Sequence, residues 1–296
     1  MDKTKAELKD LMETYELTNV YVAKATGLST TTVSMWINGT YKGDNTKVTE
    51  KIKNFIKREN ARYANWSIPI VEISIMEMVK EIARLCHTCG RIGVCVGVAG
   101  LGKTVAAKDY VSRYMDAILI ESDYSYTARS LLLELHHKLG LSCKGSTYNL
   151  MNEVVDKLKN SGRLIIIDEA ENLRREALEM TRRIHDKTGV GLLLIGREVL
   201  LNNLRGHENQ FDQMYSRVMY KKNLENLVLN DIQMLLKSAG QKIDLAKTYL
   251  VSCRGNTRRL EHLICNSINV AELNGSNEVD EAIVKETSKM LMDKED

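Results

Sequence analysis

The chain is poor in the residues that mark several protein classes. It has one proline, two phenylalanines and two tryptophans among 296 residues, and its formal net charge is only +3. Its apolar runs are much shorter than the roughly 20 residues that span a bilayer. The charged N-terminal stretch MDKTKAELKD lacks the apolar segment of a signal peptide. These absences predict a helix-rich cytoplasmic protein with no membrane partner, in which any nucleic-acid surface is a local patch.

The six cysteines follow no complete metal-binding pattern. Cys86 and Cys89 form one CxxC, but the sequence has no second CxxC to join it. A structural zinc site needs four ligands. We therefore expect the cysteines to be buried free thiols.

The chain divides into regions of different pattern. Residues 1–60 contain helical patterns only, and the segment 61–75 carries Pro69, whose ring forces its neighbour toward extended backbone. We therefore expect a small all-α domain followed by a linker. Short apolar runs then alternate with helical stretches, and beyond 225 only helical patterns remain. For the rest of the chain we predict an α/β core at 76–225 and a helical lid at 226–296.

The apolar runs of the core are continuous, as in strands buried on both faces of a parallel sheet. They occupy 94–98, 117–122, 164–168 and 191–196. The helical stretches between and beside them occupy 103–115, 127–139, 147–160 and 173–187. This alternation predicts a parallel sheet with right-handed crossover helices.

The stretch GVAGLGKT matches the phosphate-binding pattern G-x-x-x-x-G-K-[ST], with an apolar run before it and a helical stretch after it. Glycines let backbone N–H groups turn toward phosphate oxygens, and the following helix adds its N-terminal donors. In this pattern Lys103 reaches the β- and γ-phosphates, and the Thr104 hydroxyl binds Mg²⁺. The predicted site for ATP and Mg²⁺ is formed by Gly97, Gly100, Gly102, Lys103, Thr104 and Val105.

The stretch LIIIDEAENL ends an apolar run with two acidic residues. We expect Asp168 to join Thr104 in the Mg²⁺ shell and Glu169 to polarise the attacking water. A pair that merely caps the next helix is the alternative, and the phosphate loop upstream makes catalysis the better interpretation.

With these motifs, the chain from about residue 76 onward resembles the AAA+ ATPases. The resemblance implies an AAA+ P-loop sheet with a helical lid and an arginine supplied by the neighbouring subunit. Arg217 in FDQMYSRVMYKKNL stands in the matching place for this trans finger, with a plain surface arginine as the alternative. Arg258 in RGNTRRL matches the second sensor, which faces the γ-phosphate, and Arg259 is its alternative.

One position departs from the AAA+ pattern. The family usually has a small polar residue after the fourth apolar run, and this chain has Arg197 there. Arg197 either contacts the phosphate or serves the interface between subunits. The departure is compatible with slow turnover.

The stretch LTNVYVAKATGLSTTTVSMWING at 17–39 fits the spacing of a helix-turn-helix. Gly27 permits the tight turn, Ser29 is a suitable N-cap, and Gly39 closes the second helix. We expect the residues packed inside to include Val20, Leu28, Val33 and Ile37. The candidate DNA contacts are Thr30, Thr31, Thr32, Ser34 and Lys42. Because the N-terminal half of the second helix lacks Arg, Lys and Gln, we expect weak base discrimination, and a protein-docking role stays open.

The order of the two units, with GLSTTTVSMWINGTYKGDN before the phosphate loop and LIIIDEAENL, resembles the Mu B family of transposition proteins nearly end to end. The resemblance implies a slow ATPase, stimulated by DNA and transposase, that binds double-stranded DNA with little sequence preference when ATP is bound. It also implies a helical homo-oligomer that forms a filament on target DNA, delivers that DNA to a DDE transposase and stimulates strand transfer. Target selection and target immunity of a mobile element, in the nucleoid of a bacterial host, belong to the same expectation.

In such a filament, loops near helix starts face the central channel. The loops SDYSYTARS and SCKGSTYN then supply the candidate DNA contacts Arg129 and Lys144, with Tyr124 and Tyr126 beside them. Three other functions stay open: an ATP-regulated helix-turn-helix transcription regulator, a helicase loader of the same superfamily, and a scaffold whose ATP is structural.

Overall fold

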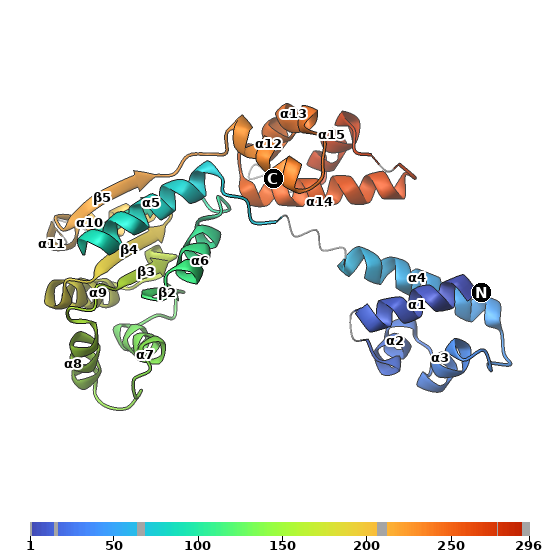
Figure 1. Cartoon of the computed structure of the whole chain (residues 1–296), viewed down its shortest axis with the longest axis horizontal. Coiled ribbons are helices and arrows are strands. Elements are labelled where there is room, and N and C mark those ends of the chain that lie inside the picture. The colour runs from blue at the N-terminus through green and yellow to red at the C-terminus, as the bar shows by residue number, and fades with distance from the viewer. Residues whose placement is uncertain (1, 15–16, 64–68, 206–211, 277, 292–296) are drawn as a thin grey trace. The chain divides into compact units, whose positions relative to one another are not determined.

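The computed structural model describes residues 2–14, 17–63, 69–205, 212–276 and 278–291. The chain forms two compact units, Met1–Ser67 and Ile68–Asp296, which are described separately (Figure 1). The predicted linker at 61–75 spans this boundary, and its residues 64–68 lie outside the described residues. Among the helices of the described ranges, none is both long and apolar enough to cross a bilayer.

The first unit is helical. Its elements are α1 (Asp2–Thr14), α2 (Asn19–Thr26), α3 (Thr30–Ile37) and α4 (Asn45–Tyr63). Between α2 and α3 the chain turns at Gly27, whose φ of 65° lies in the left-handed region that favours glycine. Ser29 caps α3 as expected, because its Oγ accepts a hydrogen bond of 3.0 Å from the Thr32 amide. The core contains Leu8, Leu11, Val22, Ala23, Val33, Trp36, Val48, Ile52, Phe55 and Ile56.

One predicted core residue of this unit is exposed. Val20 is 64% exposed, whereas Val33 is fully buried and both Leu28 and Ile37 are half-buried. The buried pair of α2 is Val22 and Ala23. At 3.6 residues per turn, Val20 points about 110° away from the midpoint of that pair. The prediction for Val20 was wrong because α2 buries only a narrow face.

The second unit is built on a parallel sheet in the order β2-β3-β4-β1-β5. Its strands are β1 (Ile92–Val96), β2 (Ala117–Glu121), β3 (Leu164–Asp168), β4 (Gly191–Gly196) and β5 (Val218–Asn223). The predicted α/β class is confirmed. The first strand begins and ends two residues earlier than expected. Gly97 and Val98 therefore belong to the loop that follows it.

The sequence did not predict β5. Among the described residues this strand pairs with β1 alone, at the edge of the sheet, and its residues alternate between half-buried and exposed. A half-exposed edge strand does not need a continuous apolar run. A search for such runs therefore finds the four buried strands and misses VMYKKN.

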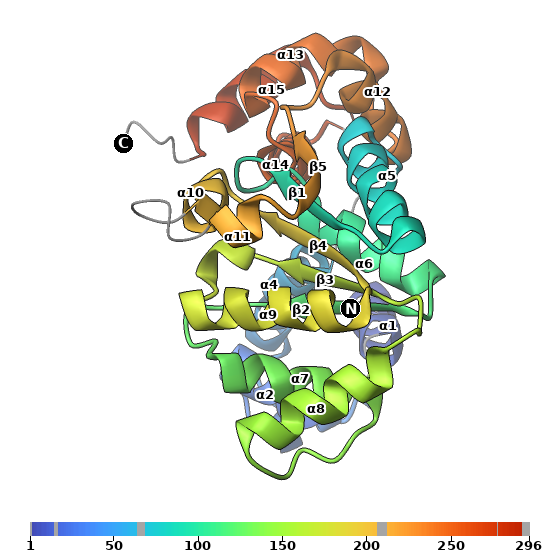
Figure 2. The ribbon, with the colours of Figure 1, turned by 90° about the vertical axis from the view of Figure 1, so that its left-hand side faces the viewer.

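Helices cover both faces of the sheet. Cys95 and Leu193 face a core shared with α5 (Ser74–Cys89) and α6 (Lys103–Arg113). Val94 and Leu194 face the other core. That second core is covered by α7 (Ala128–Leu139), α8 (Thr147–Leu158), α9 (Arg175–Thr188) and α10 (Val199–Arg205). Figure 2 shows α9 running across the sheet on the viewer's side. The short α11 (Asp212–Tyr215) precedes β5.

A group of helices follows β5. It contains α12 (Leu229–Ser238), the 3-10 turn η3 (Ile243–Leu245), α13 (Ala246–Cys253), α14 (Thr257–Leu273) and α15 (Glu281–Lys289). The buried carboxylate of Asp231 anchors this group to α5, because it accepts hydrogen bonds from Ser74 N at 2.9 Å and Ser74 Oγ at 2.7 Å. The helical group and the sheet therefore belong to one packed unit.

The cysteines are free thiols, but not all are buried. Cys89 and Cys143 are exposed, and Cys265 is half-buried. Cys89 ends α5, and Cys143 lies in the loop before α8. Burial raises the pKa of both Cys86 and Cys95 to about 12, so these two stay protonated at neutral pH. The expectation of six buried thiols was therefore wrong for Cys89, Cys143 and Cys265.

Candidate nucleotide site

The loop between β1 and α6 lies at the carboxyl end of the sheet. The Gly97 amide donates to Gly196 O at 3.1 Å, which ties the loop to the end of β4. Gly100 has a φ of 81°, and a Cβ there would lie 2.6 Å from Asn256 Oδ1. Glycine is therefore required at this point by both conformation and space. The helix α6 begins directly after the loop, at Lys103.

Lys103 lies in the hollow of this loop. Its residue exposure is only 9%, and its Nζ donates to Gly97 O at 2.8 Å and Val98 O at 2.7 Å. Burial lowers the pKa of its ammonium. A partly desolvated cation at a helix N-terminus is an effective binding point for phosphate.

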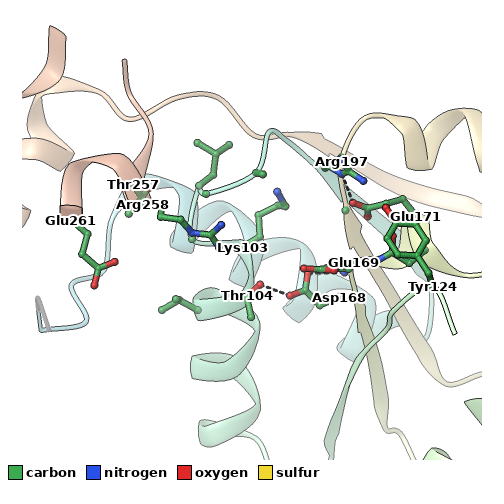
Figure 3. A pocket seen from close by; sticks show the side chains of 17 residues that line it. Lys103, Thr104, Tyr124, Asp168, Glu169, Glu171, Arg197, Thr257, Arg258 and Glu261 are labelled. Carbon is green, nitrogen blue, oxygen red and sulfur yellow. Dashed lines mark hydrogen bonds and ion pairs between the residues drawn. The ribbon is translucent and has the colours of Figure 1, made fainter. Parts of the chain in front are cut away.

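Thr104 and Asp168 meet on the floor of the cleft. The Thr104 hydroxyl donates to Asp168 Oδ2, and Asp168 is 2% exposed at the end of β3 (Figure 3). The Ser122 hydroxyl donates to Asp168 O at 3.0 Å and to Glu169 O at 2.9 Å, which holds the end of β3 against the end of β2. A hydroxyl and a carboxylate side by side form the oxygen set that Mg²⁺ prefers alongside water and phosphate. These residues fit the predicted metal site.

Glu169 has an unusual backbone. Its φ of 52° and ψ of 35° are left-handed, which is uncommon for a residue other than glycine and occurs often at functional sites. The 3-10 turn η1 (Ala170–Asn172) follows, and Asn172 Nδ2 donates to Glu169 Oε2 at 3.0 Å. Asn172 was not among the residues predicted from the sequence. Its position three residues after Glu169 was the available signal, because residues three apart lie together in a 3-10 turn.

An ion pair between an exposed arginine and a buried glutamate closes the other side of the cleft. Arg197 Nε donates to Glu171 Oε1 at 2.8 Å, and Figure 3 shows this pair beside Tyr124. The sequence singled out Arg197 but did not predict Glu171 as its partner. Twenty-six residues separate the two, so no local pattern connects them.

The helix α14 contributes to the site through its first turn. Asn256 Nδ2 donates to Ala99 O at 2.7 Å, and the Arg258 amide donates to Gly100 O at 3.0 Å. The Arg258 side chain lines the cleft. Arg259 instead donates from Nε to Ser252 O at 2.9 Å. Of the two arginines considered, Arg258 is the one in the cleft.

Together these groups enclose a cleft of about 400 Å³. The predicted site residues in its lining are Gly100, Gly102, Lys103, Thr104, Val105, Asp168, Glu169 and Arg258. A smaller apolar hollow of about 140 Å³ shares Gly102 and Val105 with it. Residues 69–71, which the sequence reasoning placed in the linker, line this hollow with Leu235 and Leu260. An apolar slot beside a phosphate loop suits a flat aromatic base.

Arg217 lies far from this cleft. Its neighbour Val218 pairs with Ile92, the first residue of β1, whereas the phosphate loop follows Val96 at the other end. Four residue steps along β1 separate Ile92 from Val96, which corresponds to roughly 13 Å along the strand. Arg217 Nε donates to Asp186 Oδ1 at 2.8 Å on α9.

Two candidate DNA contacts of this unit come together. Arg129, at the start of α7, donates from Nη2 to Gly145 O at 3.0 Å and thus lies beside the exposed Lys144. Tyr148, which is 75% exposed, follows on the first turn of α8. In the first unit, Thr30, Thr31 and Lys42 are exposed, but Thr32 and Ser34 are half-buried. The Thr32 hydroxyl lies 2.8 Å from the Ser29 hydroxyl.

Comparisons with known proteins agree with this geometry. An AAA domain family model matches residues 77–204. The ATP-dependent target DNA activator B of Escherichia phage Mu is 29% identical over 219 residues, covering 72% of this chain and 70% of its own length. The Mu-like prophage FluMu DNA transposition protein B of Haemophilus influenzae is 22% identical over 245 residues, covering 80% of this chain and 85% of its own length.

Among solved structures, the Aeropyrum pernix ORC2 protein in ADPNP–ADP complexes shares the fold. Its TM-score is 0.60 at 17% identity, covering 78% of this chain and 71% of that one. The family match, the relatives and the shared fold agree with a nucleotide cleft at this position. The chain therefore contains an AAA domain and is similar to the Mu B-like AAA+ ATPases.

Proposed function

We propose that the chain is an ATP-dependent, largely sequence-nonspecific DNA-binding ATPase that forms filaments on target DNA. In this proposal it delivers that DNA to a DDE transposase and stimulates strand transfer. The observation that carries the proposal is the similarity, over 72% of the chain, to a phage protein named as an ATP-dependent target DNA activator. The cleft adds independent support, because it brings Lys103, Thr104, Asp168 and Glu169 together.

In the proposed site, ATP lies in the cleft with its phosphates against the loop amides and Lys103. The adenine ring occupies the apolar hollow beside Val105. Thr104 and Asp168 hold Mg²⁺, which neutralises charge on the phosphates when bound. Glu169 orients the attacking water, and Arg258 approaches the γ-phosphate from α14.

The proposed homo-oligomer supplies the missing arginine. Because Arg217 lies at the opposite end of the sheet from its own phosphate loop, it serves the cleft of a neighbouring subunit. A hydrolysis site completed only by assembly explains why turnover would be slow in free subunits and faster on DNA.

DNA contact is proposed for the loops that precede α7 and α8. Arg129 hydrogen-bonds to the carbonyl of Gly145, the residue after the exposed Lys144, and the exposed Tyr148 lies on the first turn of α8. Such a group meets phosphate oxygens without reading base edges, in keeping with weak sequence preference. The exposed Thr30, Thr31 and Lys42 of the first unit are proposed as an auxiliary contact, to DNA or to a protein.

Electron microscopy of the full chain on mixed-sequence duplex DNA tests this function. With ATP, the wild type should form long continuous assemblies on arbitrary sequence, and without ATP it should leave the DNA bare. Lys103→Ala in the presence of ATP serves as the matched control and should also leave the DNA bare.

Other outcomes would favour the other candidate functions. Discrete particles on one preferred sequence would contradict the proposal and favour a transcription regulator. Binding to a replicative helicase, with no effect on a transposase, would favour a helicase loader.

A further inference from the structure

The end of α9 carries a carboxylate at a position that helices usually avoid. Asp186 lies in the last turn of α9, and the helix dipole places partial negative charge at that end. A carboxylate there is disfavoured unless cations offset the repulsion. Arg217 Nε donates to Asp186 Oδ1 at 2.8 Å, and Arg182 Nη1 donates to Asp186 Oδ2. The two oxygens of Asp186 thus join an arginine of its own helix to the arginine that precedes β5.

The topology of the sheet brings these groups together. The helix α9 leads into the amino end of β4, so its last turn lies at the amino end of the sheet. Arg217 lies at the same end, because Val218 pairs with Ile92, the first residue of β1. Thirty-one residues separate Arg217 from Asp186, so the contact depends on the fold and not on a local pattern.

Asp186 is itself held firmly by Arg182. The side chain of Arg182 is only 10% exposed, and it donates to Glu179 from Nε to Oε2 at 2.8 Å and from Nη2 to Oε1 at 2.6 Å. This two-bond contact fixes the plane of the guanidinium. The hydrogen bond from Arg182 is the main cause that lowers the pKa of Glu179 to about 2, so the pair stays charged at neutral pH. Arg182 therefore presents Nη1 to Asp186 from a fixed support.

The backbone beside Arg217 is also anchored. The Arg217 amide donates to Met214 O at 3.1 Å, and the Met214 side chain is buried in the core that α7, α8, α9 and α10 cover. The side chain of Arg217 is 37% exposed. Because Asp186 binds the Nε edge, it sets the plane of the guanidinium and the direction of the Nη groups at its tip. Arg217 therefore reaches the surface in a defined orientation.

The network of charges around Asp186 retains positive charge. Arg183 Nε also donates to Glu179 Oε1 at 2.9 Å, so three arginines share two carboxylates. An excess of this sign attracts an anion from outside the subunit. An arginine that is already ordered also avoids the entropy cost of ordering a long side chain when it meets that anion. The phosphates of ATP in a neighbouring cleft are an anion of this kind.

We propose that Asp186, which Arg182 holds in place, is a positioning residue that orients Arg217 for the cleft of the neighbouring subunit. This inference rests on the proposed role of Arg217 between subunits. Asp186 lies at the amino end of the sheet, away from its own cleft, so it acts only through Arg217. Its effect on hydrolysis therefore belongs to the neighbour's cleft and not to the cleft of its own subunit.

Phosphate release on duplex DNA, at a fixed total subunit concentration of the full chain, tests this assignment. Asp186→Asn alone should lower turnover by roughly ten- to hundredfold, because the arginine that it presents is no longer oriented. Its affinity for ATP should stay within about twofold of the wild type, since its own cleft is intact. Asp186→Glu keeps the charge and should recover part of the lost turnover.

Added Glu169→Gln subunits give the readout that a structural role would not move. They present Arg217 on an intact Asp186 to the clefts of Asp186→Asn subunits, which keep Glu169, so turnover should be partly restored. Added subunits that carry both Glu169→Gln and Asp186→Asn should restore little. Absence of rescue by Glu169→Gln subunits, or wild-type turnover in Asp186→Asn alone, would overturn the assignment.

Asp156→Asn is the matched control. Asp156 is exposed on α8, so the same loss of charge there should leave turnover near wild type. Arg217→Ala separates this inference from the proposed function. Loss of turnover in Arg217→Ala beside wild-type turnover in Asp186→Asn would overturn the positioning role alone. Wild-type turnover in Arg217→Ala would overturn the proposed role of Arg217 between subunits and the positioning role together.

Discussion

Two adjacent carboxylates at the end of β3 have different surroundings. Asp168 is 2% exposed and accepts the Thr104 hydroxyl, so it is fixed beside the phosphate loop. Glu169 is exposed, has a left-handed backbone, and is bonded through its side chain to Asn172. A buried, fixed carboxylate suits metal binding, whereas an exposed one that faces the cleft suits work on a water molecule.

This division of roles predicts the behaviour of Glu169→Gln. The substitution removes the base and preserves the shape, so ATP and DNA binding should remain near wild type. Phosphate release should fall by about a hundredfold or more, in line with loss of a general base. A coupled assay of phosphate release, beside a filter-binding assay for ATP, measures both.

Glu176→Gln is the control for that substitution. Glu176 is exposed on the first turn of α9 and does not line the cleft, so the same loss of charge there should leave turnover unchanged. Wild-type turnover in Glu169→Gln would remove Glu169 from the proposed role.

At the scale of elements, the side chain of one residue, Asn256, connects the phosphate loop to α14. Asn256 caps α14, because its Oδ1 accepts from the Arg259 amide at 3.1 Å. The same side chain donates to Ala99 O at 2.7 Å in the loop. The two roles link nucleotide binding to the helices that follow the sheet.

Two substitutions of Asn256 separate these roles. Asn256→Ser keeps a good N-cap but is too short to reach the loop, so stability should stay near wild type while ATP affinity falls. Asn256→Ala loses both contacts, and its free energy of unfolding should also be about 1 kcal/mol lower than that of the wild type. Denaturant unfolding and ATP titration measure the two effects. Equal ATP affinity in Asn256→Ser and wild type would show that the loop contact has no bearing on nucleotide binding.

At the scale of the whole molecule, the proposed catalytic groups lie at opposite ends of the sheet. Lys103 and Glu169 lie at the carboxyl end, and Arg217 precedes the amino end of β5. A single copy cannot bring Arg217 to its own cleft without unfolding the sheet. Hydrolysis through this arginine therefore requires a second copy.

Mixing variants tests that requirement. Arg217→Ala should lack turnover, and adding Glu169→Gln subunits should restore part of it, because they supply the arginine to clefts that keep Glu169. Adding a double variant, Glu169→Gln with Arg217→Ala, is the control and should restore nothing. Phosphate release at a fixed total subunit concentration is the measurement. Equal turnover in both mixtures would leave Arg217 without a role between subunits.

Local patterns explain which parts of this unit were predictable. The four buried strands appear in the sequence as continuous apolar runs because both of their faces are covered, and the phosphate loop is a contiguous motif with fixed glycine positions. The edge strand β5 has no such run and was missed. Val20 was misplaced because the burial of a short helix depends on which neighbour covers it.

The amino-acid sequence by itself determined the class of the fold and the presence of a site with Lys103, Thr104, Asp168 and Glu169, because these depend on contacts within short segments or at the ends of recognisable strands. Only the tertiary structure decided which distant side chains meet. The order of the sheet places the end of β3 beside the end of β4 and thereby joins Glu171 to Arg197. The packing of α14 directs Arg258, rather than Arg259, into the cleft, and the strand direction sets Arg217 at the amino end of the sheet. Such contacts follow from strand order and helix packing, which no single stretch of sequence specifies.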